Sequence, residues 1–210
     1  MNERSRTRSR FAVALPAVLC LLLFSAGVRA EDATQPGPDA EFGGQILTLT
    51  EPQQADFKSD DPRFRDNKNG TVTDLQHHLV WEQRDSYQSQ KKWLNWNDAQ
   101  NYIKKFNETE FGGASTWRLP TREELQSLYD ENKSVPWNYY WTKNEVHIDP
   151  IFGNSSCCYW SIEELSGEMA WGFNYIRGKA YPSMKGGIQK SLTVIRAVRD
   201  LADSEKVSLK

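Results

Sequence analysis

The stretch Ser115–Leu128, STWRLPTREELQSL, carries the clearest local signal in the chain. Within it, Thr121 and Glu124 spell a T-x-x-E capping box, in which each side chain accepts a hydrogen bond from a backbone N–H at the start of a helix. Pro120 stands just before the box and cannot extend the helix backwards. Apolar side chains then follow at helical spacing: Leu125, Leu128 and Tyr129. The stretch therefore predicts a short helix with one buried face.

A second helix is predicted upstream, beginning after Asn95. Asparagine is a strong helix N-cap, and Asp98 stands three residues later, where it can complete a pair that is similar to a capping box. Apolar residues repeat at helical spacing: Trp96, Ala99, Tyr102, Ile103 and Phe106. Gly112 and Gly113 end this unit.

Turn residues predict two β-hairpins. The first spans 64–74, and its turn Asn67–Gly70 ends in Asn-Gly, which supplies the positive φ that a tight turn needs. The second joins 170–176 to 179–184 around an Arg-Gly turn. Further strands are predicted from apolar or alternating runs: Ile46–Thr50, Leu79–Trp81, Tyr159–Glu163 and Leu192–Val198. The last of these is predicted to close the sheet.

Together these elements predict an α+β fold with small antiparallel sheets, two short helices and long loops. Aromatic residues are abundant, with 8 Trp, 8 Tyr and 9 Phe among 210 residues, so a core rich in rings is expected. Residues 62–200 are assigned to this domain. Residues 201–210 are a tail that is frayed or forms a short surface helix. The stretch Ser134–Trp141, SVPWNYYW, is an aromatic loop or a short strand.

Residues 1–30 are typical of a secretory signal peptide. Four arginines precede an apolar run at Phe11–Phe24, and Val28 and Ala30 occupy the positions that a signal peptidase reads. The apolar run is shorter than the roughly 20 residues of a membrane span. We expect cleavage after Ala30 and a periplasmic or secreted product without stable membrane insertion, with a retained signal anchor as the alternative. Residues 31–61 then form a flexible leader with a possible first strand.

The charge balance argues against a nucleic-acid partner or an anionic-membrane partner. The full chain has a net charge of −2, and removing residues 1–30 takes away five arginines and one glutamate, which leaves a mildly acidic protein. A local basic patch stays open as an alternative, because four lysines lie close in sequence: Lys91, Lys92, Lys104 and Lys105.

The cysteines that remain after signal cleavage, Cys157 and Cys158, are adjacent. Neighbouring Cα atoms lie about 3.8 Å apart, closer than in an ordinary disulfide, so a bond between them would form a strained vicinal ring. An oxidising compartment favours this candidate disulfide. Free thiols or a link to another chain are the alternatives. A metal site is not supported, because no His or third Cys lies at ligand spacing.

Catalytic and cofactor motifs are absent from the sequence. The histidines His77, His78 and His147 form no zinc-hydrolase pattern, and there is no G-x-S-x-G or phosphate-binding loop. The acidic hairpin turn lacks the spacing of a calcium-binding loop, because Lys68 occupies the third ligand position. The sequence therefore predicts no catalytic residue, no metal and no cofactor.

A family resemblance rests on three sequence motifs: RFRDNKNGTVTD (63–74), STWRLPTREELQSL (115–128) and IRAVR (195–199). Through these motifs, the chain resembles the Lcl C-terminal domain family over roughly residues 62–200. The resemblance implies an exported bacterial protein with a C-type-lectin-like fold, shared distantly with formylglycine-generating enzymes. Some members of the family are adhesins that bind sulfated polysaccharides, but a shared fold does not transfer function.

The chain departs from the family at Ile103 and Ala197, where many members carry cysteines. Losing both together implies that an apolar contact replaces a cross-link, although removing a disulfide alone typically costs about 2–5 kcal/mol. Other packing must then contribute.

Two groups of side chains are candidate ligand contacts. Aromatic rings that can stack on a sugar lie in one stretch: Trp137, Tyr139, Tyr140 and Trp141. Most rings in a Trp-rich domain are core, which is the alternative. Three arginines lie in the motifs that carry the family resemblance: Arg118, Arg196 and Arg199. Arg118 is the candidate for gripping an anion bidentately, but pairing with internal carboxylates is favoured for all three.

The leading functional hypothesis is a non-enzymatic, adhesin-like binding module that recognises a glycan or an envelope or surface protein through variable loops. One alternative is a structural subunit of an envelope assembly. The other is an oxidase of the formylglycine-generating type, but Cys157 and Cys158 lack the spacing that its chemistry needs.

Overall fold

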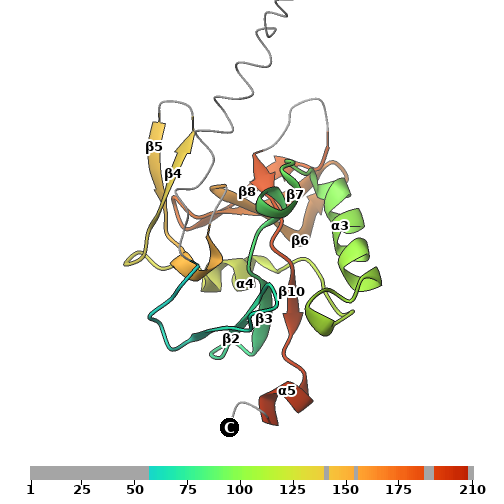
Figure 1. Ribbon diagram of the computed structural model, residues 1–210. Helices are drawn as coiled ribbons and strands as arrows, with labels where there is room; N and C mark the ends of the chain where they lie inside the picture. Colours follow the sequence, from blue (N-terminus) through green and yellow to red (C-terminus); the bar gives the residue numbers. More distant parts are fainter. Residues whose placement is uncertain (1–56, 140–141, 154–155, 187–191, 208–210) are drawn as a thin grey trace, which may run out of the picture. The chain divides into compact units, whose positions relative to one another are not determined.

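The computed structural model of the chain describes residues 57–139, 142–153, 156–186 and 192–207. This described part is an α+β fold of small sheets, short helices and loops (Figure 1). The predicted signal peptide and the leader up to residue 56, with its possible strand at Ile46–Thr50, lie outside the described residues.

One four-stranded antiparallel sheet has the order β1-β2-β3-β10. Its strands are β1 (Phe64–Asp66), β2 (Thr71–Asp74), β3 (Leu79–Glu82) and β10 (Val198–Asp200). The first predicted hairpin is confirmed, with Lys68 and Gly70 at positive φ in its turn. The Asp66 carboxylate accepts a 2.7 Å hydrogen bond from the Lys68 N–H, so this acidic side chain stabilises the turn.

A second four-stranded sheet has the order β8-β7-β6-β9. Its strands are β6 (Cys158–Ser166), β7 (Met169–Asn174), β8 (Lys179–Met184) and β9 (Thr193–Val194). The second predicted hairpin, β7 with β8, is confirmed. Strand β9 runs parallel to β6, and the other pairs are antiparallel.

The prediction of one closing strand at Leu192–Val198 is wrong. The segment starts in the second sheet as β9 and then crosses to the first sheet as β10. Ile195 and Ala197 pack into one buried cluster, whereas the Arg196 guanidinium lies over the rings of the other cluster. Successive side chains thus alternate between two buried clusters without strand pairing, which is why periodicity alone predicted a single strand.

The aromatic stretch begins as a strand. β4 (Val135–Tyr139) pairs antiparallel with β5 (Thr142–Val146), and Figure 1 shows this two-stranded sheet as a separate hairpin. The tip of the hairpin lies outside the described residues.

Both predicted helices are present. α3 (Trp96–Glu108) begins after Asn95, whose side chain accepts a 2.8 Å hydrogen bond from the Asp98 N–H. α4 (Arg122–Ser127) begins after Thr121, and its full capping box is formed. The remaining helical segments are α2 (Ser86–Gln90), α5 (Asp203–Val207) and the 3-10 turns η1 (Phe111–Gly113) and η2 (Pro150–Phe152). The sequence did not predict α2. The helix α5 matches one of the two alternatives predicted for residues 201–210, a short surface helix.

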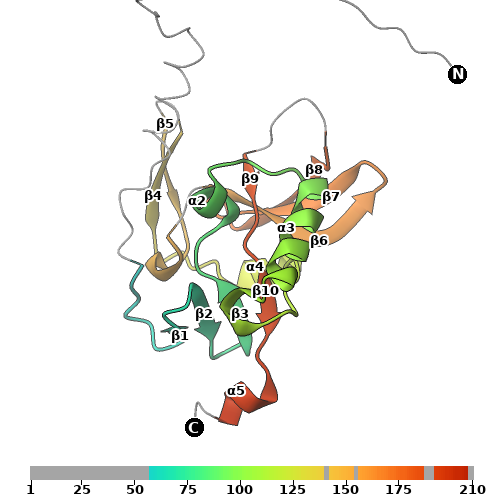
Figure 2. The same ribbon diagram turned by 45° about the vertical axis from the view of Figure 1, so that its right-hand side comes forward.

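Tryptophan side chains join α3 to the second sheet. The Trp96 indole donates a 2.9 Å hydrogen bond to the Ser161 carbonyl on β6, and the Trp160 indole donates one of 3.0 Å to the Leu94 carbonyl. Figure 2 shows α3 running beside this sheet. Ile103 and Ala197 belong to the same buried cluster as these rings, so apolar packing fills the positions where many family members carry cysteines. Among the described residues, no helix combines the length and apolar character needed to cross a membrane.

Candidate functional site

The predicted aromatic contacts fall into two settings. Trp137 is 5% exposed and lies in a hydrophobic core cluster, so little of its ring is open to a sugar. Tyr139 ends β4, but its side chain lies outside the described residues, as do Tyr140 and Trp141. The burial of Trp137 favours the core interpretation for that ring.

Arg118 binds internal carboxylates. Its guanidinium donates two 2.7 Å hydrogen bonds to Glu124 and one of 3.1 Å to Asp200. Burial alone would raise the pKa of Glu124, but the Arg118 guanidinium and the Thr121 N–H lower it below the usual value. Because Glu124 also closes the capping box, Arg118 orders the start of α4 and supports the internal-pairing interpretation.

The other two arginines of the family motifs also contact carboxylates within the chain. Arg196 is fully buried, donates a 2.9 Å hydrogen bond to the Glu82 carbonyl and lies 3.7 Å from the Asp85 carboxylate. Arg199 grips Glu205 of α5 with two bonds of 2.7 and 2.6 Å. Both guanidiniums therefore hold segments of the fold together.

The structure joins Cys157 and Cys158 by a disulfide, with Cα atoms 3.8 Å apart. Both residues are buried in a core cluster. The Tyr175 N–H donates a 2.8 Å hydrogen bond to the Cys157 carbonyl, which ties the pair to the end of the second hairpin. In this bonded form the pair presents no thiol for metal binding.

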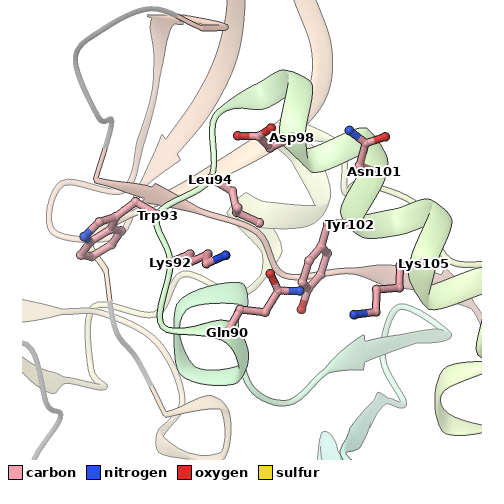
Figure 3. Close-up of a pocket in the computed structure, with 8 residues that line it drawn as sticks. All are labelled: Gln90, Lys92, Trp93, Leu94, Asp98, Asn101, Tyr102 and Lys105. Carbon is pink, nitrogen blue, oxygen red and sulfur yellow. The ribbon is translucent and has the colours of Figure 1, made fainter. Parts of the chain in front are cut away.

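A cleft of about 420 Å³ lies between α2, the segment after it and α3 (Figure 3). Its lining residues are Gln90, Lys92, Trp93, Leu94, Asp98, Asn101, Tyr102 and Lys105. The volume falls in the range of small-ligand sites. Because amines, amides and apolar surface meet here, we take this cleft as the candidate site.

Local sequence explains how the cleft forms. Asp85 and Gln88 make a reciprocal capping box that starts α2. At the end of α2, Lys91 adopts the left-handed conformation, with φ 56° and ψ 33°, and redirects the chain into the segment that lines the cleft. Trp93 in this segment stacks on Tyr87 of α2, with ring centroids 4.3 Å apart. The segment is thus fixed before it reaches α3.

Two lysines supply positive charge from different walls. Lys92 follows α2, Lys105 lies on α3, and Figure 3 shows both side chains reaching into the cleft. Neither forms an ion pair with a carboxylate of the described residues, whereas neighbouring Lys104 lies 3.7 Å from Glu108. Asp98 is the acidic residue of the lining. The pair of lysines therefore makes the cleft a site for an anionic group.

Tyr102 forms the base of the cleft and is 4% exposed. Its hydroxyl is hydrogen-bonded to the buried Glu82 carboxyl and lies 3.2 Å from Oγ of Ser89 on α2. The second Glu82 oxygen accepts a 3.0 Å hydrogen bond from the Ala197 N–H. Burial raises the pKa of Glu82 to about 8, although the hydrogen bonds and the nearby Arg196 lower it in part.

A family model of the Lcl C-terminal domain matches residues 70–199, more than half of the chain. The chain belongs to the Lcl C-terminal domain family. The matched range runs from the first hairpin to β10 and includes the cleft. No curated protein matches the chain. Membership of the family assigns no activity to this chain by itself.

The sequence of this Lcl C-terminal domain identifies the basic residues but not the cleft. Of the four lysines in the predicted local patch, only Lys92 and Lys105 line it. The signal that could have found the cleft is the D-x-x-Q capping box at Asp85 and Gln88, because it shows that a short helix ends just before Lys92.

In a second cleft of the Lcl C-terminal domain, a lysine is already paired with carboxylates of the chain. It lies where residues 58–62 meet 132–134 and 149–150. Lys133 in its lining is held by Asp61, at 2.7 Å, and by Asp149. Within the described ranges, no three His, Cys, Asp or Glu side chains are grouped so as to hold a metal ion.

Proposed function

We propose that the chain is an exported, non-enzymatic, adhesin-like binding module that recognises an acidic glycan in the cleft between α2 and α3. One observation carries the proposal. Lys92 and Lys105 reach into the same cleft, above the ring of Tyr102, and have no carboxylate partner among the described residues. Two ammonium groups on different walls suit a sulfate or carboxylate, and the ring and Leu94 offer apolar surface to a sugar.

The polar lining supports a sugar rather than a simple anion. Gln90 and Asn101 carry amides that both donate and accept, as sugar hydroxyls require. Figure 3 shows Asp98 and Asn101 on the turn of α3 farther from Lys105. An anionic group is therefore favoured near the lysines, and hydroxyl groups are favoured near Asp98.

The remaining parts of the proposal come from the sequence. Export is supported by the signal-like residues 1–30, and the absence of enzymatic function by the lack of a catalytic motif. The oxidase alternative is less supported, because Cys157 and Cys158 are bonded to each other and buried.

A matched pair of double variants tests the proposal on residues 31–210. Neutral, carboxylated and sulfated oligosaccharides of equal length are compared by calorimetry. Lys92→Gln with Lys105→Gln removes the cleft amines. Lys104→Gln with Lys179→Gln removes the same net charge from exposed positions outside the lining.

We expect acidic sugars to bind more tightly than neutral ones. The cleft variant should weaken that binding about tenfold or more, and the control variant should leave it nearly unchanged. Equal weakening in both variants would mean that net charge alone attracts the ligand. No preference for acidic sugars would overturn the proposal.

One observation favours the alternative of a structural subunit. Three large apolar side chains are exposed on β6 and β8: Ile162, Leu165 and Met184. Exposed apolar surface of this kind can mark a protein contact. Sedimentation of the mature chain alone and of Ile162→Thr with Leu165→Thr tests this. Self-association that the double variant abolishes would support a subunit role, and a monomer at all concentrations would argue against self-assembly.

A further inference from the structure

We propose that binding of an anionic ligand in the cleft depends on a proton, because Tyr102 at its base connects the cleft to the buried carboxyl of Glu82. This inference rests on the proposed function, since it concerns regulation of the same site. Tyr102 lines the cleft with its ring, and its hydroxyl meets Glu82 on β3 and Ser89 on α2. One hydroxyl therefore joins both walls of the cleft to a buried acid.

The charged and polar groups around Glu82 come from α3, from the segment between β9 and β10, and from the start of α2. Tyr102 approaches from α3, the Ala197 N–H from the segment between β9 and β10, and Arg196 donates to the Glu82 carbonyl. The Arg196 guanidinium is shared with Asp85, which lies 3.7 Å away just before α2. The Glu82 carboxylate therefore has no cation of its own within this group.

The hydrogen-bond chain needs the Glu82 proton. Ser89 Oγ donates to the Asp85 carbonyl at 2.9 Å, so its single proton is used there. With Glu82 protonated, the carboxyl donates to the Tyr102 hydroxyl, and Tyr102 donates to Ser89. With Glu82 ionised, Tyr102 donates to the carboxylate instead, and no proton remains for the 3.2 Å contact between Tyr102 and Ser89.

Loss of that proton has two effects on the cleft. Either the hydrogen bond between Tyr102 and Ser89 is lost, or Ser89 gives up its hydrogen bond to the Asp85 carbonyl. In both cases the distance between α2 and α3 is no longer fixed by this chain of hydrogen bonds. In addition, a negative charge then lies behind the base of a site that binds anions. Both effects weaken binding. Because burial raises the pKa of Glu82 to about 8, the change falls in an accessible range.

The test measures the affinity of the mature chain for a sulfated dextran oligosaccharide from pH 6.5 to 9.5 at constant ionic strength. Sulfate does not titrate there, and Glu82→Gln controls for every other titrating group of the chain. We expect affinity to fall about fivefold between pH 7 and 9 for the wild type and to stay flat in Glu82→Gln. Ser89→Ala, at an exposed position, should bind more weakly than the wild type at pH 7, because the link between α2 and α3 is lost. Its affinity should still fall towards pH 9, because the Glu82 charge appears there as well.

A ligand-free measurement separates this inference from the proposed function. In the isotope-labelled protein, the Glu82 carboxyl ¹³C shift and the Ser89 amide shift should titrate together. If they do so but no acidic sugar binds, the coupling stands and the proposed function fails. If the wild type binds equally at all pH values, or Glu82→Gln keeps the pH dependence, the coupling is overturned.

Discussion

At the scale of single residues, burial changes the acid–base chemistry of Glu82. It is 2% exposed, it is hydrogen-bonded to the Tyr102 hydroxyl and accepts from the Ala197 N–H, and burial raises its pKa to about 8. Since the ordinary pKa is 4.5, the folded chain binds more protons than the unfolded chain between these two values. The free energy of unfolding therefore falls as pH rises through this interval, with a limiting slope of about 1.4 kcal/mol per pH unit.

Glu82→Gln should remove this dependence. The amide can donate to Tyr102 and accept from Ala197, as the protonated carboxyl does, so the variant keeps the contacts without the charge. Denaturant unfolding at pH 6 and pH 8.5 should show the wild type losing stability and the variant losing much less. Parallel loss in both proteins would show that another group titrates.

The state of Cys157 and Cys158 is a second prediction at this scale. The structure joins them to each other, so the unreduced, unfolded mature chain should take up no maleimide label. After reduction it should take up a label on each thiol. Labelling without reductant, or a disulfide-linked dimer on a non-reducing gel, would favour one of the alternative states.

At the scale of elements, caps decide where the helices start. Thr121 accepts a 3.1 Å hydrogen bond from the Glu124 N–H, and Glu124 accepts one from the Thr121 N–H at 2.8 Å. Thr121→Ala should lower the free energy of unfolding by about 1 kcal/mol. The exposed Thr116→Ala serves as control and should change it by less than about 0.5 kcal/mol. Equal effects in chemical denaturation would contradict a capping role.

Local sequence signals made much of the secondary structure predictable. The Asn-Gly turn, the Asn95 cap and the Thr121 box each act within a few residues, so the first hairpin and both longer helices follow from the sequence. The cleft does not, because Lys92 and Lys105 meet only after Lys91 turns the chain in the left-handed conformation. The partnership of Tyr102 with Glu82 spans twenty residues and has no local signal.

At the scale of the whole molecule, the segment from β9 to β10 ties the two four-stranded sheets together. Arg196 lies in the middle of this crossing, fully buried, with its charge near that of Asp85. Arg196→Met should cost about 3–5 kcal/mol, because it removes a buried cation 3.7 Å from the Asp85 carboxylate. Fluorescence and circular dichroism should lose their signals in one coincident transition at lower denaturant. Separate transitions would show that the sheets unfold independently.

The central proposal is that ligand binds in the cleft rather than at the tip of the β4–β5 hairpin, and amide chemical-shift mapping tests it most directly. A sulfated dextran oligosaccharide is titrated into the labelled mature chain. The predicted result is that the largest shift changes cluster at Lys92, Leu94, Asn101 and Lys105, which line the cleft. Shift changes concentrated at 137–143, with the cleft amides unmoved, would contradict the proposal.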